Sequence, residues 1–371
     1  MFKRGVVDDH DRLSTWSSEE DCCAWSGVEC SNITHRVTKL DLQPKNYVDY
    51  FKPLKDLDLS HNMFYGSYPS TLANLSSLVS LRIGSNSLSG GISQTIFSNL
   101  PNLEVLDLSN LTFAFHFHPD FIPPFQLGWL DMSNTNQGPY FPSWIYTQKL
   151  LYSLDISNSR ISFIDEYKFG SLIAGIEFLQ LSNNSIRGDI SNVTLNATEI
   201  YLDHNNFTAS LPHISPNASH VDLSYNSFSG PIPCSWKNFK NLEFINLWSN
   251  QLSGEVPTDL SNWTQVLVLN LGKNKLSGTI PIKMPQNLQV MILRSNQFEG
   301  NIPPQIFNLS FLCHLDLAHN NLSGSIPHSA YNMTQMIKDK TDTWYINSII
   351  DLFTKADGYL IKASLLLEAA H

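Results

Sequence analysis

One phrase recurs along this chain, and it limits the possible fold more than any other feature. The copy at 242–257 reads LEFINLWSNQLSGEVP, and the copy at 312–327 reads LCHLDLAHNNLSGSIP. Each copy has apolar residues at fixed positions, one fixed polar residue, and a closing Gly and Pro. A single copy cannot bury its own apolar side, so the copies must stack on one another. The sequence therefore predicts a solenoid.

The fixed polar position sets the register of the repeats. The residues at this position are Asn62, Asn86, Leu111, Thr135, Ser159, Asn184, Asn205, Asn226, Asn250, Asn274, Asn296 and Asn320. Most steps between them are 24 or 25 residues long, with shorter steps of 21 and 22. This period, with the pattern LxxLxLxxNxL, is typical of leucine-rich repeats. We predict an α/β leucine-rich-repeat solenoid, a right-handed curved superhelix with a parallel β-sheet on its concave side.

The repeated asparagine has a structural explanation. After each strand the chain must turn, and the turn leaves backbone donors and acceptors near the core. A buried amide satisfies both kinds of group. Thr135 and Ser159 can do part of this, whereas Leu111 cannot, so we expect a local defect there. We predict an asparagine ladder formed by Asn62, Asn86, Asn184, Asn205, Asn226, Asn250, Asn274, Asn296 and Asn320.

The ending SGxIP predicts the convex side. Its glycines fall where a sharp turn needs a positive φ, and the residue before each Pro favours extended backbone. We expect second short strands and 3-10 turns there. The two 21-residue steps between Asn184 and Asn226 leave no room for such a turn. The glycines predicted to have a positive φ in the repeat endings are Gly90, Gly230, Gly254, Gly278 and Gly324.

Three features resemble known plant proteins. The LSGxIP ending resembles the plant-specific class of leucine-rich repeats. The pattern W-x(4)-DCCxWxGVxC at 16–30 is similar to the cap that precedes plant extracellular repeats. The section 122–162, with its words PPFQL, GPxFPxW, TQ and LDISN, resembles plant receptor-like proteins of the type that senses fungal xylanase. The resemblance covers roughly 13–333.

The resemblance implies a division of the chain and a disulfide. Residues 1–43 form a partial N-terminal cap, 44–332 form an array of about 12 repeats, and 333–371 form an irregular tail, either an island remnant or a truncated end. It implies a Cys23–Cys30 bridge, with a signal peptide and the partner of Cys22 expected upstream. A zinc site of Cys22, Cys23, Cys30 and His35 is a poorer alternative, because the chain lacks a CxxC pair. We expect Cys234 and Cys313 to be free and packed.

The bulk charge and the sequons point to an extracellular protein. The net charge is −10 and the pI is about 5.6, which argues against nucleic acid or an anionic membrane surface as partner. No run of about 20 apolar residues is present, so we expect no membrane-spanning helix in this chain. Many Asn-x-Ser/Thr sequons favour passage through the secretory route. They are Asn32, Asn74, Asn110, Asn183, Asn192, Asn196, Asn206, Asn217, Asn262, Asn308, Asn321 and Asn332.

The sequence predicts binding and not catalysis. It contains no HExxH, GxSxG, GxGxxG, Walker or kinase signature, so we expect no enzyme activity and no cofactor. His116 and His118 have no nearby carboxylate or thiolate cluster to complete a metal site. Aromatic and charged residues at outward strand positions favour protein binding. The candidate concave-face residues are Tyr201, Asp203, His204, Asp222, Tyr225, Asn246, Trp248, Asn270, Lys273, Ile292 and Arg294.

The resemblance implies the rest of the functional hypothesis. The chain would be the ectodomain of a plant receptor-like protein on the extracellular side of the plasma membrane. By this resemblance it would bind a peptide or protein of pathogen origin and signal in defence through a leucine-rich-repeat receptor kinase. Two alternatives stay open: a secreted inhibitor similar to the polygalacturonase-inhibiting proteins, which share the cap and the repeats, and a non-functional receptor fragment.

Overall fold

The computed structural model describes residues 22–25, 28–30, 37–40, 54–67, 70–112 and 114–332. The chain forms two compact units, unit 1 with residues 1–187 and unit 2 with residues 188–371, and each is described by itself. Near the N-terminus a 3-10 turn, η2 (Cys22–Ala24), precedes β1 (Val28–Cys30), which pairs antiparallel with β2 (Val37–Leu40). Trp25 is buried beside them. Trp16 and the tail 333–371 lie outside the described residues.

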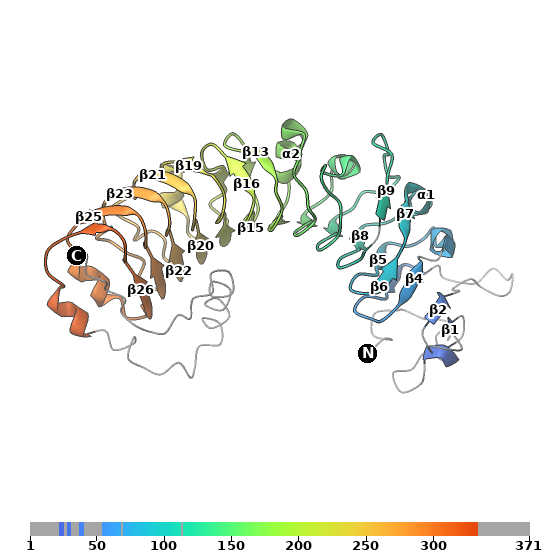
Figure 1. Cartoon of the computed structure of the whole chain (residues 1–371), viewed down its shortest axis with the longest axis horizontal. Helices are drawn as coiled ribbons and strands as arrows, with labels where there is room; N and C mark the ends of the chain where they lie inside the picture. Colours follow the sequence, from blue (N-terminus) through green and yellow to red (C-terminus); the bar gives the residue numbers. More distant parts are fainter. Residues whose placement is uncertain are drawn as a thin grey trace. The chain divides into compact units, whose positions relative to one another are not determined.

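Unit 1 is built on a parallel sheet with one strand from each coil (Figure 1). The strands follow one another in the order β3 (Asp56–Asp58), β5 (Ser80–Arg82), β8 (Val105–Asp107), β10 (Trp129–Asp131), β11 (Ser153–Asp155) and β12 (Phe178–Gln180). The opposite side of the coils carries β4 (Tyr65–Ser67), β6 (Ser87–Ser89), β7 (Gly91–Ser93), β9 (Ala114–His116), η3 (Ser70–Asn74), α1 (Gln94–Phe97), η4 (Ser143–Thr147) and α2 (Glu166–Ile173). The strand β13 (Arg187–Asp189) stands at the boundary of the two units.

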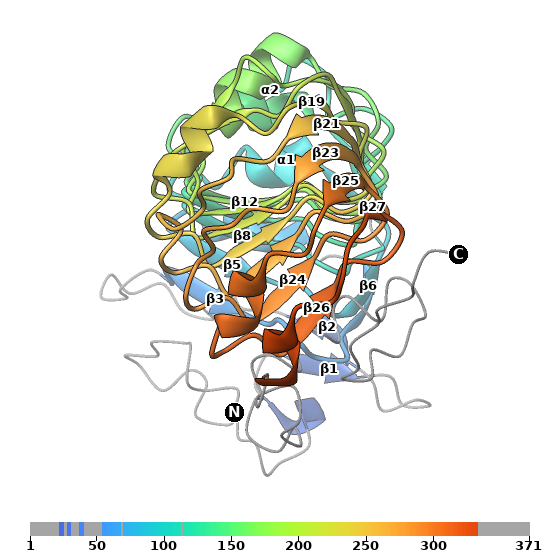
Figure 2. The ribbon, with the colours of Figure 1, turned by 90° about the vertical axis from the view of Figure 1, so that its left-hand side faces the viewer.

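Unit 2 repeats this plan, and Figure 2 shows its second strands following one another in a row. The parallel sheet consists of β15 (Glu199–Tyr201), β18 (His220–Asp222), β20 (Phe244–Asn246), β22 (Val268–Asn270), β24 (Val290–Ile292) and β26 (His314–Asp316). The other side has β14 (Thr194–Leu195), β16 (Asn206–Thr208), β17 (His213–Ile214), β19 (Ser229–Gly230), β21 (Gln251–Glu255), β23 (Lys275–Thr279), β25 (Gln297–Gly300), β27 (Asn321–Leu322), η5 (Cys234–Asn238), η6 (Pro304–Asn308) and η7 (His328–Asn332).

The alternation of side chains along each strand determines which residues form the core. The middle residue of each three-residue strand in the long sheets, such as Ile245 in β20, is buried, because successive side chains point to opposite faces. The next apolar residue along the chain, Leu247, is also fully buried. Each coil thus adds one layer to a continuous apolar core. The expected leucine-rich-repeat architecture is confirmed.

Hydrogen bonds from the repeated asparagines join the coils. Asn250 donates through Nδ2 to the carbonyl oxygen of Leu223 at 2.9 Å and to that of Leu247 at 3.2 Å. Its Oδ1 accepts from the amide of Phe228 at 3.0 Å. The side chain therefore bonds its own coil and the preceding coil, which satisfies turn groups that the core would otherwise leave unpaired.

The three exceptions in the register behave differently from asparagine. The hydroxyls of Thr135 and Ser159 both donate to the carbonyl oxygen of Met132, at 2.6 and 2.9 Å. Leu111 turns its apolar side chain into the core, where it is 1% exposed. The two hydroxyls replace part of the amide's bonding, whereas Leu111 provides packing alone.

The convex-side turns follow the expected chemistry. Gly254 has a φ of 84° in β21, a conformation that residues with a Cβ adopt only with strain. In the shortest coils, β14 pairs parallel with β17, and no 3-10 turn stands between β14 and β19. Each 21-residue coil holds three short strands and no 3-10 turn, as the repeat spacing predicted for the turn.

The cysteines differ from the expectation in one respect. Cys23 forms a disulfide, while the pairing with Cys30 stays a prediction. Cys234 and Cys313 are free thiols. Cys234 is exposed rather than packed, because it begins the solvent-facing turn η5. Cys313 is half-buried, and its Sγ lies 3.2 Å from the carbonyl oxygen of Gln289.

Candidate functional site

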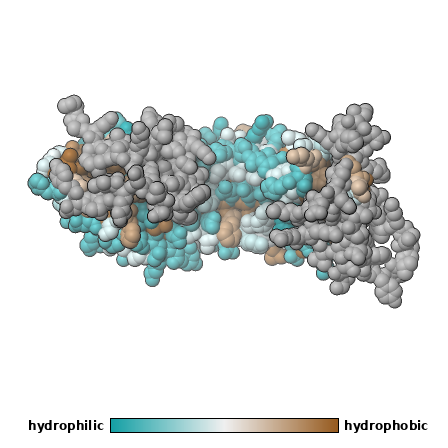
Figure 3. Space-filling model, turned by 90° about the horizontal axis from the view of Figure 1, so that it is seen from below, coloured by the Kyte–Doolittle hydropathy of each residue, from teal (hydrophilic) through white to brown (hydrophobic). Residues whose placement is uncertain are grey.

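The side of the long sheet in unit 2 that is turned away from the core, here called the sheet face, carries the candidate site. Its residues come from the first and third positions of β15, β18, β20, β22, β24 and β26 and from the turns that follow these strands. Figure 3 is a view from below, and hydrophilic and hydrophobic residues lie side by side on the surface coloured there.

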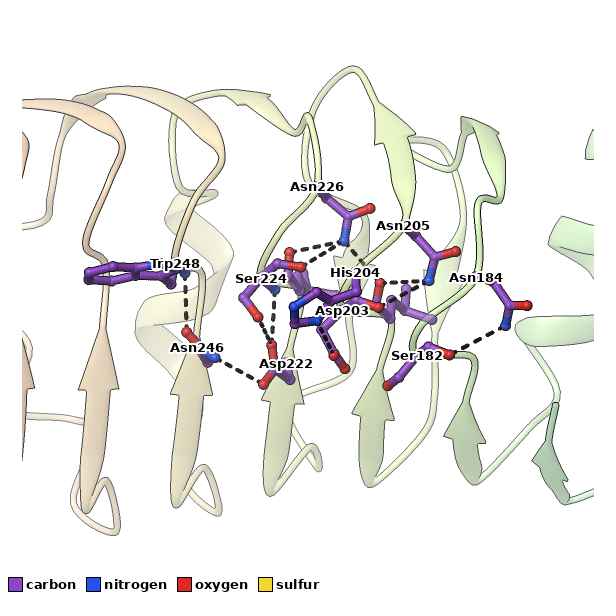
Figure 4. Close-up of polar contacts among 12 residues, drawn as sticks. Ser182, Asn184, Asp203, His204, Asn205, Asp222, Ser224, Asn226, Asn246 and Trp248 are labelled. Atoms are coloured by element: carbon purple, nitrogen blue, oxygen red, sulfur yellow. Dashed lines mark hydrogen bonds and ion pairs between the residues drawn. The ribbon is translucent and has the colours of Figure 1, made fainter. Parts of the chain in front are cut away.

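A polar cluster occupies the first coils of this sheet face (Figure 4). His204 Nδ1 lies 2.8 Å from Asp203 Oδ2, and the His204 ring stacks on Tyr225 with 4.2 Å between ring centroids. On the neighbouring strands, Asn246 Nδ2 donates to Asp222 Oδ2 at 2.9 Å. Residues from three successive coils are therefore held in fixed orientations, and hydrogen bonding and stacking provide the rigidity that recognition needs.

The charge of this cluster depends on pH. Burial, together with the nearby charge of Asp203, raises the pKa of Asp222 to about 7, although hydrogen bonds from Ser224 and Asn246 act to lower it. The cluster therefore loses negative charge near neutral pH, where carboxyls on an open surface stay ionised. A ligand would meet a less acidic surface than the sequence suggests.

Trp248 is the large aromatic group of the sheet face. It is half-buried, and Lys273 Nζ lies 4.9 Å from the centroid of its ring. The six-membered ring rests against Gly272, where the absence of a side chain leaves room for it. One coil further, Arg294 forms an ion pair with Asp316 at 3.3 Å. An aromatic ring beside fixed charged groups is the arrangement that dominates many protein interfaces.

Three of the predicted residues are buried and therefore poorly available to a ligand. Asn246 is 4% exposed, Asn270 is 2% exposed and Ile292 is 6% exposed. The amide oxygens of Asn246 and Asn270 accept from backbone N–H groups two residues ahead, at 3.2 Å each. Ile292 packs with apolar neighbours. Local bonding and packing occupy these three side chains, so they offer little surface to a ligand, and their assignment as ligand contacts on the concave face stays a prediction.

Several other predicted residues do not stand on strands. His204, Tyr225 and Lys273 lie in the turns after β15, β18 and β22, with φ of 52°, 49° and 48°. Asp203, Trp248 and Arg294 also follow the ends of their strands. The repeat pattern counted them as strand positions because it does not mark where pairing stops. The accessible part of the candidate site is thus the row of turns at the carboxyl ends of the strands.

An apolar cluster on the same face was missed by the sequence analysis. Val268, Val290 and Ile292 are buried together, and Phe244 and Trp248 pack against them. The signal was present, because β22 and β24 place apolar residues on both faces of the strand, which breaks the usual alternation. The side chain of Trp248 packs against this apolar cluster, which helps to hold the ring in place.

The sequon asparagines that the structure describes with their side chains are all exposed. They are Asn74, Asn110, Asn183, Asn192, Asn196, Asn206, Asn217, Asn262, Asn308 and Asn321. Asn32 and the side chain of Asn332 lie outside the described residues. Exposure is necessary for glycan attachment, so glycosylation at these positions stays a prediction.

Comparison with known families identifies two modules. The leucine-rich-repeat N-terminal domain matches residues 1–31, and the leucine-rich repeat matches residues 53–75, 217–239, 241–263, 287–309 and 311–333. No helix among the described residues has the length and apolar character needed to cross a membrane.

Two of the curated relatives are receptor-like proteins of Solanum lycopersicum. Receptor-like protein EIX1 of Solanum lycopersicum is 34% identical over 264 residues, which is 49% of this chain and 25% of that protein. Receptor-like protein EIX2 of the same species is 40% identical over 102 residues, which is 28% of this chain and 10% of that protein. The chain thus spans a quarter or less of the length of these relatives.

A solved structure supports the same assignment. The crystal structure of PEPR1-AtPEP1 matches 90% of this chain and 53% of that chain, with 27% identity and a TM-score of 0.64. The repeat pattern, the N-terminal module and these relatives lead to one conclusion. The chain is a leucine-rich-repeat protein, and parts of its sequence are similar to plant receptor-like proteins.

Proposed function

We propose that the chain is the ligand-binding part of a plant receptor-like protein and that it recognises a peptide or protein through the sheet face of unit 2. It acts in defence, on the extracellular side of the plasma membrane, and signals through a partner receptor kinase. The relatives named receptor-like proteins support the receptor class. The defence role, the partner kinase and the location rest on family resemblance.

The observation that carries the proposal is the setting of Trp248. Its ring has the Lys273 cation on one side and an apolar cluster behind it, and the Arg294–Asp316 ion pair begins two coils further along the chain. A large ring fixed in this way loses little entropy when a partner covers it, so it is suited to be a binding anchor. Arg294 adds a planar group that pairs well with a carboxylate or a backbone carbonyl.

The test begins with capture, since the ligand has to be identified. The full chain, secreted from plant cells, is immobilised and exposed to a fungal culture filtrate, and retained peptides and proteins are identified by mass spectrometry. Each is then titrated against the native chain and the Trp248→Ala/Arg294→Ala variant. We expect the variant to lose at least about a hundredfold in affinity, because two anchors are removed.

The control is the Glu255→Gln/Glu299→Gln variant, which alters two exposed residues on the second strands β21 and β25. Its affinity should match that of the native chain, and all three proteins should unfold in a comparable cooperative transition. If the native chain and the Trp248→Ala/Arg294→Ala variant bound the ligand with equal affinity, the sheet face of unit 2 would not be the binding surface.

A further inference from the structure

Unit 1 has a second surface with a different chemistry. Three aromatic residues stand at or next to the starts of neighbouring strands: Trp129 on β10, Tyr152 just before β11, and Phe178 on β12. Phe178 is 40% exposed and Tyr152 is 48% exposed, while Trp129 is half-buried. We call these three residues the aromatic face. Large apolar groups left this open on a sheet are candidates for contact with another molecule.

The aromatic face contains a notch. Ser153 on β11 pairs in register with Trp129 on one side and with Phe178 on the other. Neighbouring strands lie about 4.8 Å apart, so the backbone positions that carry the two rings stand about 10 Å apart, one on each side of the small serine. That gap is wide enough for one extended aliphatic side chain between the rings.

A row of carboxylates runs beside the aromatic face. Asp107, Asp131 and Asp155 are paired in register on β8, β10 and β11, two residues beyond the aromatic row. One oxygen of each, Oδ1, accepts from a serine amide two residues ahead. No hydrogen bond or ion pair within the described part of the chain reaches the second oxygen of any of the three.

Unit 2 shows that this lack of partners is not a property of the repeat. At the same strand position there, Asp222 Oδ2 accepts from Asn246 Nδ2, and Asp316 is paired with Arg294. In unit 1 the cation nearest along the row is Arg82, which pairs in register with Asp107. Arg82 is directed elsewhere, since its Nη1 donates to Ser80 Oγ and its guanidinium lies 5.8 Å from the Trp129 ring centroid.

The carboxylates also repel one another. Burial raises the pKa of Asp131 to about 6, and the charges of Asp155 and Asp107 act in the same direction. An external cation would relieve this repulsion. A single metal ion fits poorly, because the described residues contain no group of three acidic, histidine or cysteine side chains placed around one point.

We propose that the aromatic face of unit 1 docks an extended protein segment that carries arginine or lysine. The aliphatic stem of such a residue lies in the notch over Ser153, between Trp129 and Phe178, and its cationic head reaches Asp131 and Asp155. Long basic side chains combine an apolar stem with a charged tip, and the two rows offer these two environments in that order.

The spacing defines a probe. In an extended chain, alternate residues lie about 6.6–7 Å apart on one side, so two basic residues at alternate positions span the carboxylate row. We would use a fluorescent decapeptide of alternating Arg and Ser and an otherwise identical peptide of alternating citrulline and Ser, which has the same shape without charge. Binding to the full chain is measured by fluorescence anisotropy at physiological salt.

We expect the Arg peptide to bind and the citrulline peptide to bind at least about tenfold more weakly. The Asp131→Asn/Asp155→Asn variant should lose at least about tenfold in affinity for the Arg peptide. Phe178→Ser, which opens one wall of the notch, should also weaken binding. The matched control is Glu255→Gln/Glu299→Gln, which removes the same charge from exposed positions elsewhere and should leave binding unchanged.

Three results would overturn the proposal. The first is equal affinity for the Arg and citrulline peptides. The second is an equal loss in the control variant, which would mean general attraction to an acidic protein. The third is an unchanged affinity in both the Asp131→Asn/Asp155→Asn and Phe178→Ser variants. Thermal unfolding of each variant verifies that it is folded before its affinity is compared, and the two variants give independent tests.

Discussion

The indole ring of Trp248 rests against Gly272, so closely that a Cβ on Gly272 would collide with Cζ3 of Trp248. The two residues belong to neighbouring coils. The glycine of one coil therefore sets the position of the aromatic anchor of the other. Gly272 has no unusual backbone conformation that requires glycine, so its role is to leave space.

This contact predicts the effect of Gly272→Ala. The added methyl must displace the Trp248 ring, and we expect a loss of about 1–3 kcal/mol in the free energy of unfolding, together with weaker ligand binding. Chemical denaturation measures the first quantity. Gly175→Ala is the control, because a Cβ there meets one atom at an ordinary distance of 3.6 Å. Equal stability of the Gly272→Ala variant and the native chain would contradict the packing described here.

The asparagine ladder predicts a gradient of effects along the chain. Asn250 bonds two coils and accepts one amide, so Asn250→Ala leaves several buried groups unpaired and should cost about 2–4 kcal/mol. Among the described residues, Asn62 donates to the carbonyl oxygens of Leu59 and Ser60, both in its own coil. Asn62→Ala should therefore cost about 1 kcal/mol or less. Equal costs at the two positions would mean that bonding between coils contributes little.

The positive-φ turns predict a stabilising substitution. Ser295 has a φ of 55° at the position where other coils place Asn110, Asn134, Asn158 and Asn183 with similar φ. Asparagine adopts this conformation more readily than serine, so Ser295→Asn should raise the free energy of unfolding by about 0.5–1 kcal/mol. A decrease in the melting temperature would show that the Ser295 side chain has a bonding role of its own.

Asp131 predicts a pH dependence of stability. Its pKa is raised in the folded chain to about 6 from an ordinary value of 3.8. Between these values the folded chain binds more protons than the unfolded chain, so this group lowers stability as pH rises from about 4 to about 6. Asp131→Asn removes this pH dependence. The free energy of unfolding of the variant, relative to that of the native chain, should therefore rise by about 1–2 kcal/mol between pH 4 and pH 7 after solvent screening.

Urea unfolding of the native chain and the Asp131→Asn variant at several pH values measures this difference. Asp259, whose pKa the ion pair with Lys283 and hydrogen bonds lower to about 2, contributes in the opposite direction and mostly below pH 4. The difference between the two proteins cancels that contribution. A constant difference from pH 4 to pH 7 would mean that the pKa of Asp131 is not raised.

The sequence was sufficient to predict what repetition enforces. The spacing of the repeats predicts one sheet strand in each coil and the two short coils. The glycines predict the turns, because few other residues adopt a positive φ without strain. Single residues at the surface were harder to place. Asn246 and Asn270 look like exposed polar groups in the pattern, but short backbone contacts occupy them.

The aromatic face of unit 1 escaped the sequence analysis for a related reason. Trp129 and Phe178 are 49 residues apart in the chain, and only strand pairing through Ser153 makes them neighbours of one notch. Likewise, Oδ2 of the aspartate at this strand position has a side-chain partner at Asp222 and Asp316 in unit 2, and none at Asp107, Asp131 or Asp155 among the described residues of unit 1. Its role depends on the side chains of the adjacent coil, which a single repeat does not show.

The most direct test of the account is hydroxyl-radical footprinting of the full chain with and without a captured ligand. If the sheet face of unit 2 binds the ligand, oxidation of Trp248 and Tyr225 should fall on binding. Tyr167, which is 88% exposed on α2, should be oxidised equally in both samples. Protection of Tyr167 with no change at Trp248 and Tyr225 would contradict the central claim.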